Sequence, residues 1–192
     1  MKKLLITGFD PFGGESINPA WEAVKLLPDQ IGDWILTKQM IPTVFGTAAQ
    51  TVLETAAELE PDVILCIGQA GGRSAVTPER IGINVRDARI SDNAGNQPTD
   101  QPIVPEGPDG LFSPLPIKSM VEAIAAEGIS AAVSNSAGTF VCNDVLYTLL
   151  HHYHMTSCRV GFIHVPFLPE QGTPSLPLSD TVRALTAAIG VL

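Results

Sequence analysis

Short apolar runs alternate with amphipathic stretches along most of the chain. Continuous apolar runs of about four to eight residues indicate buried strands, and apolar positions three or four apart indicate helices. The predicted strands are 4–7, 34–41, 62–68, 131–136 and 159–166, and the predicted helices are 19–27, 43–60, 117–125, 139–154 and 177–191. This alternation predicts an α/β fold, a three-layer α/β/α sandwich with a mostly parallel central sheet.

Several element boundaries are also visible in the sequence. Asn18 followed by Pro19 is typical of an N-cap and a first helical position. Thr43 is expected to cap the next helix, which runs to about Glu60. Residues 80–90 (RIGINVRDARI) alternate in polarity and predict a hairpin or an edge excursion. The segment Ser91–Pro116 is rich in Pro, Gly, Asp and Asn, and long irregular segments of this kind are often functional.

Composition narrows the class of protein. The chain has 192 residues, 45% of them hydrophobic and 16% charged, which fits one domain over residues 1–192. Its net charge of −9 and the lack of a basic stripe argue against nucleic acids and anionic membrane surfaces as partners. No window reaches the roughly 18 apolar residues of a membrane span, and the opening MKKLLITGFD is interpreted as an interior strand. Three separated cysteines without a CxxC motif favour a reducing, cytoplasmic setting.

Candidate chemistry collects where predicted strands end. In open parallel sheets, ligands bind at the carboxyl ends of the strands. Two of the segments there are rich in glycine, GFDPFGG (8–14) and GQAGG (68–72). Two others carry reactive side chains, Cys142 in SNSAGTFVC and His164 in IHVP. A cysteine and a histidine on neighbouring strand-end loops predict a cysteine hydrolase.

Cys142 is expected in the first turn of a helix, provided that Thr139 lies near the N-cap. The free backbone N–H groups and the helix dipole favour an anion there. With a nearby imidazolium, such a position is expected to lower the pKa of the thiol into the range ~3.5–7.5, although Asp144 would oppose this. Position alone does not exclude a core cysteine, because Leu146 and Leu149 follow on the same helical face.

His164 lies in an apolar stretch, VGFIHVPF, where a lone histidine is more often a core residue. It is a candidate general base only together with Cys142. A base needs an acceptor that orients its second nitrogen, and Glu79 is the best candidate for this role. The alternative for Glu79 is a surface ion pair with Arg80 or Arg86.

Other chemistries find less support in the sequence. His151 and His154 share a helical face, but no third ligand is evident, so no metal site is expected. GFDPFGG matches neither a dinucleotide-binding loop nor a phosphate-binding loop, and it carries an acid where a phosphate would lie.

Four segments together resemble the pyroglutamyl peptidase I family of cysteine peptidases. They are TGFDPFGG…NP (7–19), GQAGGRSAVTPERIGINVRDARI…DN (68–93), SNSAGTFVCN (134–143) and GFIHVPFLPEQ (161–171). The resemblance covers essentially the whole chain, and Gly82 in place of the family's usual alanine is a small departure. It implies hydrolytic removal of an N-terminal pyroglutamyl residue from peptides, a single α/β/α domain without a cofactor, a homotetramer and a cytosolic location.

The resemblance also implies specific roles for residues. Its catalytic triad falls on Glu79, Cys142 and His164. The implied substrate-binding residues are Phe9, Phe12, Gln69, Ile90, Phe140 and Val141, with Arg89 near the reacting carbonyl. Aromatic side chains suit the faces of a neutral lactam ring, although the sequence alone would place Phe9 and Phe12 in the core.

Two alternatives remain open on the residues alone. One is a cysteine hydrolase of the same architecture that acts on other small amides or esters. The other is an α/β module that binds a ligand without catalysis, in which Cys142 is a core residue.

Overall fold

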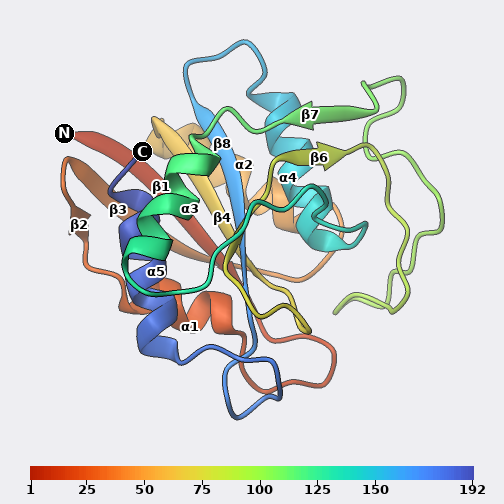
Figure 1. Cartoon of the computed structure of the whole chain (residues 1–192). Helices are drawn as coiled ribbons and strands as arrows, with labels where there is room; N and C mark the ends of the chain where they lie inside the picture. The colour runs from red at the N-terminus through yellow and green to blue at the C-terminus, as the bar shows by residue number, and fades with distance from the viewer.

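The computed structural model describes residues 1–192 and has a six-stranded sheet covered by helices on both faces (Figure 1). The strands, in their spatial order, are β2 (Gln30–Ile31), β3 (Trp34–Ile41), β1 (Lys2–Phe9), β4 (Val63–Gln69), β8 (Arg159–Val165) and β5 (Thr77–Pro78). The four inner strands are parallel, and the two-residue strands β2 and β5 lie antiparallel at the edges. The predicted α/β/α sandwich with a mostly parallel sheet is therefore confirmed.

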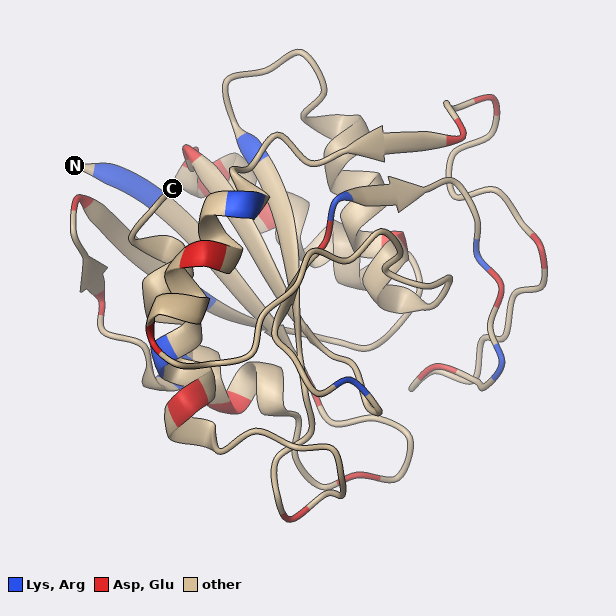
Figure 2. Cartoon of the chain, in the orientation of Figure 1, with Lys and Arg blue, Asp and Glu red and all other residues tan.

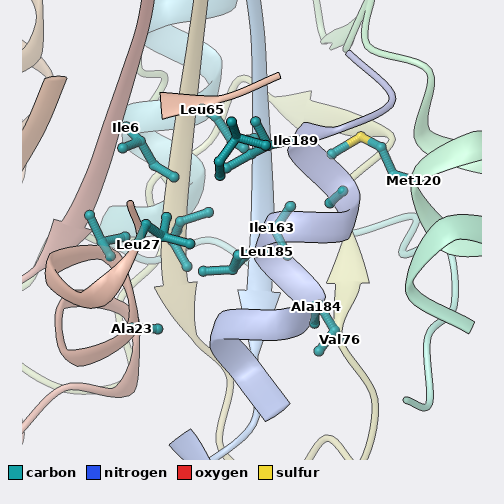
Figure 3. Packing of buried hydrophobic residues seen from close by; sticks show 14 of the residues in the cluster. Ile6, Ala23, Leu27, Leu65, Val76, Met120, Ile163, Ala184, Leu185 and Ile189 are labelled. Atoms are coloured by element: carbon teal, nitrogen blue, oxygen red, sulfur yellow. The ribbon is translucent and has the colours of Figure 1, made fainter. Parts of the chain in front are cut away.

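Each face of the sheet is covered by its own set of helices. The helices α1 (Pro19–Leu26), α3 (Ile117–Ala126) and α5 (Leu178–Ile189) cover one face, and α2 (Thr47–Leu59) and α4 (Val141–His152) cover the other. Successive residues of β4 alternate between the two hydrophobic cores, as the pleat of a strand requires. Figure 3 shows the first core, where Leu185 and Ile189 of α5 lie against Leu65 and Ile163 of the sheet.

Two boundary predictions were confirmed and one was wrong. Asn18 caps α1 by accepting a hydrogen bond from the Ala20 N–H (3.0 Å), and β3 spans the predicted residues 34–41. Thr43, in contrast, does not cap α2. The chain makes a further turn through Gly46, whose φ of 72° suits glycine, and α2 begins only at residue 47.

The predicted strand 131–136 was wrong. This segment makes only isolated bridges, from Ala131 to Val76 and from Ser134 to Glu79. Its neighbour β5 is two residues long and includes Pro78, which has no N–H to donate, so an extended ladder cannot form.

Residues 80–90 do not form a hairpin by themselves. The strand β6 (Ile81–Ile83) pairs with β7 (Gly110–Phe112), which lies within the segment expected to be irregular. This pair and the long connection between its strands project beyond the sheet at the right of Figure 1. In Figure 2, basic and acidic positions are interspersed along the chain. None of the helices combines the length and apolar character needed to cross a bilayer.

Candidate active site

The start of α4 positions Cys142. The helix begins at Val141, with Phe140 as the N-cap, so Cys142 is the second helical residue. Thr139 was expected near the cap, but its hydroxyl donates to the Asp87 carbonyl (2.6 Å) and no side chain caps the helix. The first N–H groups of α4 therefore have no partner from the helix or from a cap.

Gly68 brings Cys142 and His164 to the same point of the sheet. Gly68 is the register partner of His164 across β4 and β8. A β-carbon on Gly68 would lie 3.0 Å from the Cys142 Sγ and 2.7 Å from the Phe162 ring. Only glycine therefore lets the thiol approach the backbone of β4 beside the imidazole.

Glu79 orients the His164 ring. The two residues are separated by 85 positions, and Glu79 Oε1 lies 2.7 Å from His164 Nδ1. Glu79 is fully buried and His164 is 3% exposed. An ionised carboxylate can only accept, so the proton is assigned to Nδ1, and Nε2 keeps a free lone pair. This arrangement is the one that a general base requires.

The cation paired with Glu79 was not foreseen from the sequence. Arg73 Nη1 donates to Glu79 Oε1 (2.8 Å). The two arginines of the alternative surface ion pair lie elsewhere, because Arg80 bonds Asn135 and Arg86 bonds Asp144. Arg73 falls within the segment that carries the family resemblance, but an offset of six residues across an irregular turn has no periodic signature.

The protonation states differ from the expectation for a ready thiolate. Burial, followed by the negative charge of Glu79, raises the pKa of the Cys142 thiol to about 12. Burial also lowers the pKa of His164, despite the attraction of Glu79. For Glu79, burial alone would raise the pKa, but the hydrogen bond and charge of His164, followed by the hydrogen bonds of Ser134 and Arg73, outweigh it and lower the pKa. The predicted low thiol pKa therefore differs from the direction found in the folded site, where burial favours the neutral form of both the thiol and the imidazole.

A pocket with a volume of about 400 Å³ opens beside the start of α4. Phe12, Arg89, Ile90 and Phe140, four of the expected substrate-binding residues, line it. The Phe12 and Phe140 ring centroids are 6.1 Å apart, and Phe45 packs edge-on against Phe140 at 5.3 Å. Phe140, one of the aromatic walls of the pocket, thus precedes Cys142 by only two residues in the sequence.

Three expected substrate-binding residues lie outside this lining. Phe9 is 2% exposed and packs against Phe162 at 6.2 Å, and Val141 is fully buried in the same core. Gln69 ends β4, and its Oε1 accepts a hydrogen bond from Gln171 Nε2 at 3.0 Å. The side chains of Phe9 and Val141 are therefore parts of the core that supports the site.

Asp144, whose role was open, joins three segments. Its Oδ1 accepts from Arg86 Nε (2.6 Å), and its Oδ2 accepts from the Gly46 N–H (2.8 Å). Its charge is thus compensated by groups other than Cys142.

The irregular segment Ser91–Pro116 is attached to the loop that carries Phe12. Asn93, near the start of this segment, donates to the Pro11 carbonyl (2.9 Å).

The site therefore has the parts of a cysteine hydrolase on an α/β/α sandwich. These parts are a thiol at a helix start, a buried histidine and a carboxylate that orients the histidine. No three His, Cys, Asp or Glu side chains gather in a way that could hold a metal ion.

The comparisons with known proteins define the family. A family model described as pyroglutamyl peptidase matches residues 2–192. A pyrrolidone-carboxylate peptidase of Levilactobacillus brevis is 56% identical, over 97% of this chain and 95% of its own length. The crystal structure of pyroglutamyl peptidase I from Bacillus amyloliquefaciens is 47% identical, with a TM-score of 0.96 over 100% of this chain and 96% of that one. The pyrrolidone carboxyl peptidase from Thermococcus litoralis is 35% identical, with a TM-score of 0.95 over 100% and 93%.

The chain belongs to the pyroglutamyl peptidase family. It is a hydrolase of the cysteine peptidase class with pyroglutamyl peptidase activity.

Proposed function

We propose that Cys142, His164 and Glu79 are the nucleophile, the general base and the orienting acid of this peptidase. The observation that carries the proposal is the position of His164. Its Nδ1 lies 2.7 Å from the buried Glu79, and its backbone is paired with Gly68, which the Cys142 Sγ contacts. This arrangement, with the thiol beside Gly68 of β4 and the imidazole at the paired position of β8, supports proton transfer from Cys142 to a His164 that Glu79 orients.

The reaction begins from a neutral thiol. As Cys142 Sγ attacks the carbonyl carbon that links pyroglutamate to the next residue, His164 Nε2 takes the thiol proton. The imidazolium, stabilised by Glu79, then gives that proton to the leaving amine as the C–N bond breaks. Water, deprotonated by His164, hydrolyses the thioester, which releases pyroglutamate and restores the thiol.

Charge on the carbonyl oxygen would be stabilised by the start of α4. The N–H of Cys142 lies in the first helical turn, where backbone donors have no intrahelical acceptor. Arg89 is exposed at the pocket, with no hydrogen bond or ion pair to the protein, and is available to the same oxygen. The N–H of Val141, rather than its buried side chain, would serve the substrate.

The pocket would select a lactam. Phe12, Ile90 and Phe140 offer apolar contacts to the ring. Gln69, at the end of β4 and outside this lining, is the proposed polar partner of the lactam amide. Phe9 would act indirectly, by packing under the site against Phe162. A free amine on glutamine would lose its hydration in such a pocket, and proline would leave the polar partner unmet, so both should be rejected.

The partners and setting follow from this chemistry. The substrates would be peptides and proteins with an N-terminal pyroglutamyl residue, and the chemistry requires neither a metal nor a cofactor. The three free cysteines suit a reducing, cytoplasmic location, and the net charge of −9 does not favour nucleic acids. We also propose a homotetramer, which light scattering of the purified chain would test.

Hydrolysis of a pyroglutamyl-arylamide tests the roles of the triad. Cys142→Ser should lower kcat by at least about a thousandfold and leave the fold unchanged by circular dichroism. Cys158→Ser, one residue before β8, is the matched control and should keep full activity. Normal turnover by Cys142→Ser would refute the proposal, and prolyl or glutaminyl arylamides cleaved equally well would indicate a broader amide hydrolase.

A further inference from the structure

Arg73 joins three segments that build the site. Its Nη1 donates to the Glu79 carboxylate (2.8 Å) and to the Thr77 hydroxyl (2.7 Å), and its Nη2 donates to the Ser136 carbonyl (3.0 Å). Thr77 is paired with His164 across β5 and β8. Ser136 lies in the segment that leads into α4. One guanidinium thus connects the acid, the strand beside the base and the approach to the nucleophile.

Arg73 and His164 bind the same oxygen of Glu79. Both hydrogen bonds end on Oε1, whereas Oε2 is buried without a hydrogen-bond partner. Loss of Arg73 would leave the His164 hydrogen bond as the only one on Oε1, so the buried carboxylate would be less firmly held in place. The only cation paired with it is Arg73, whose side chain remains 32% exposed and so keeps part of its own hydration.

We infer that Arg73 is a positioning residue for the proposed triad, which holds the Glu79 carboxylate in place and thereby fixes the orientation and tautomer of His164. The inference rests on the proposed function of the triad. Arg73 acts through Glu79 and not on the substrate. The planar fork of a guanidinium can reach Glu79, Thr77 and Ser136 at once, which the single ammonium of a lysine cannot reproduce.

The charges around His164 determine whether loss of Arg73 raises or lowers the pKa of His164. The titratable groups on the elements packed around it are Glu79 after β5, Arg73 in the preceding loop, Cys142 on α4 and Cys66 on β4. The Glu79 hydrogen bond and charge favour the imidazolium, and the Arg73 charge lowers the pKa of His164. Removal of Arg73 should therefore raise the pKa of His164, so that more of the base is protonated at neutral pH.

The kinetic test compares Arg73→Met with Arg80→Met. Arg80 is a matched control, because it binds only Asn135 of the same neighbouring segment and no member of the triad. Arg73→Met should lower kcat about 10- to 100-fold, the usual range for a lost hydrogen bond to a charged group, with a smaller change in KM. The acid limb of kcat/KM should move to higher pH. Arg73→Lys should restore the position of that limb but only part of kcat.

A second readout does not depend on activity. In a Cys142→Ser background labelled with ¹⁵N, the His164 ring nitrogens report tautomer and protonation directly by NMR. With Arg73 present, the proton should lie on Nδ1. Arg73→Met should raise the pH at which the ring titrates, and Arg80→Met should leave it unchanged. Circular dichroism of each variant shows whether the fold is retained, and Arg73→Gln serves in place of Arg73→Met if that chain does not fold.

The outcomes separate this inference from the triad proposal. Glu79→Gln should abolish most activity, and full activity in that variant would refute the triad itself. If Glu79→Gln is inactive but Arg73→Met keeps the wild-type kcat and pH profile, only the inference about Arg73 fails. A loss of kcat equal to that of Arg80→Met, without movement of the acid limb or of the His164 titration, would also overturn it.

Discussion

The Cys142 sulfur lies 3.0 Å from the point that a β-carbon on Gly68 of β4 would occupy. His164 lies opposite Gly68 on the neighbouring strand β8. The proposed nucleophile and base are therefore positioned by two adjacent central strands, which are among the most rigid parts of an α/β fold, and not by a flexible loop alone.

Gly68→Ala should damage both activity and stability. The new methyl group would lie 2.7 Å from the Phe162 ring as well as against the sulfur, so the core must shift. Overpacking of this kind costs about 1–3 kcal/mol, and a misplaced nucleophile should lower kcat about a hundredfold. Gly190→Ala is the control, because its nearest contacts, at 3.5 and 3.6 Å, are ordinary. Urea unfolding and arylamide hydrolysis measure both effects, and wild-type activity in Gly68→Ala would contradict this geometry.

The alkylation rate of Cys142 should rise steeply with pH. Burial and the Glu79 charge raise the pKa of the thiol to about 12, so most of it is protonated at neutral pH. Below that pKa, the thiolate fraction grows about tenfold per pH unit. The alkylation rate should grow in the same proportion, because only the thiolate reacts. Iodoacetamide labelling between pH 7 and pH 9, in a Cys158→Ser background that removes a partly exposed thiol, measures this rate. A rate independent of pH over this range would instead indicate a preformed thiolate–imidazolium pair.

Phe140→Ala should weaken substrate recognition more than folding. Phe140 forms a pocket wall with Phe12 and an edge-on pair with Phe45. Loss of an aromatic contact and its apolar area should lower kcat/KM for a pyroglutamyl-arylamide about tenfold or more, mainly through KM. Phe112→Ala, which changes the exposed last residue of β7, is the control and should keep its KM. An unchanged KM in Phe140→Ala would mean that the lactam ring of the substrate binds elsewhere.

Asp144→Ala should destabilise the fold. Its carboxylate is fully buried and accepts from both Arg86 and the Gly46 N–H. Removal of an acceptor of charged hydrogen bonds costs about 1.5–3 kcal/mol, and Arg86 would be left without its partner. Denaturant unfolding measures this loss. Asp180→Ala, which removes one acceptor of the exposed Arg183, should change stability little. Equal stabilities of the two variants would rule out this structural role.

The sequence predicted the regular parts of the fold because they follow from local periodicity. The apolar run of β4, the alternation of β3 and the Asn18 cap are each encoded within a few neighbouring residues. Residues 131–136 looked equally like a strand, yet the ladder depends on a partner, and the two-residue β5 offers almost none. The start of α2 was misplaced because Gly46 adds a turn that the helical pattern does not record.

The candidate site was predictable only in part, for a related reason. Strand ends indicated where Cys142 and His164 would lie, because topology gathers those ends at one edge. The Arg73–Glu79 pair depends on how an irregular loop folds back, so neighbouring cations in the sequence were poor guides. The thiol pKa could not be foreseen either, since burial and the charge of Glu79 are properties of the folded site.

The short strand β5 also has a consequence for thermal behaviour. It precedes Glu79, is two residues long, and has β8 as its only neighbour in the sheet, with isolated bridges to residues 131–134 on its other side. Edge segments with few ladder bonds exchange their amide hydrogens through local openings that cost less than global unfolding. On warming, the amide of Glu79 should therefore lose hydrogen-exchange protection before those of β4, and heat inactivation should begin at temperatures where the far-ultraviolet spectrum is still that of the folded protein.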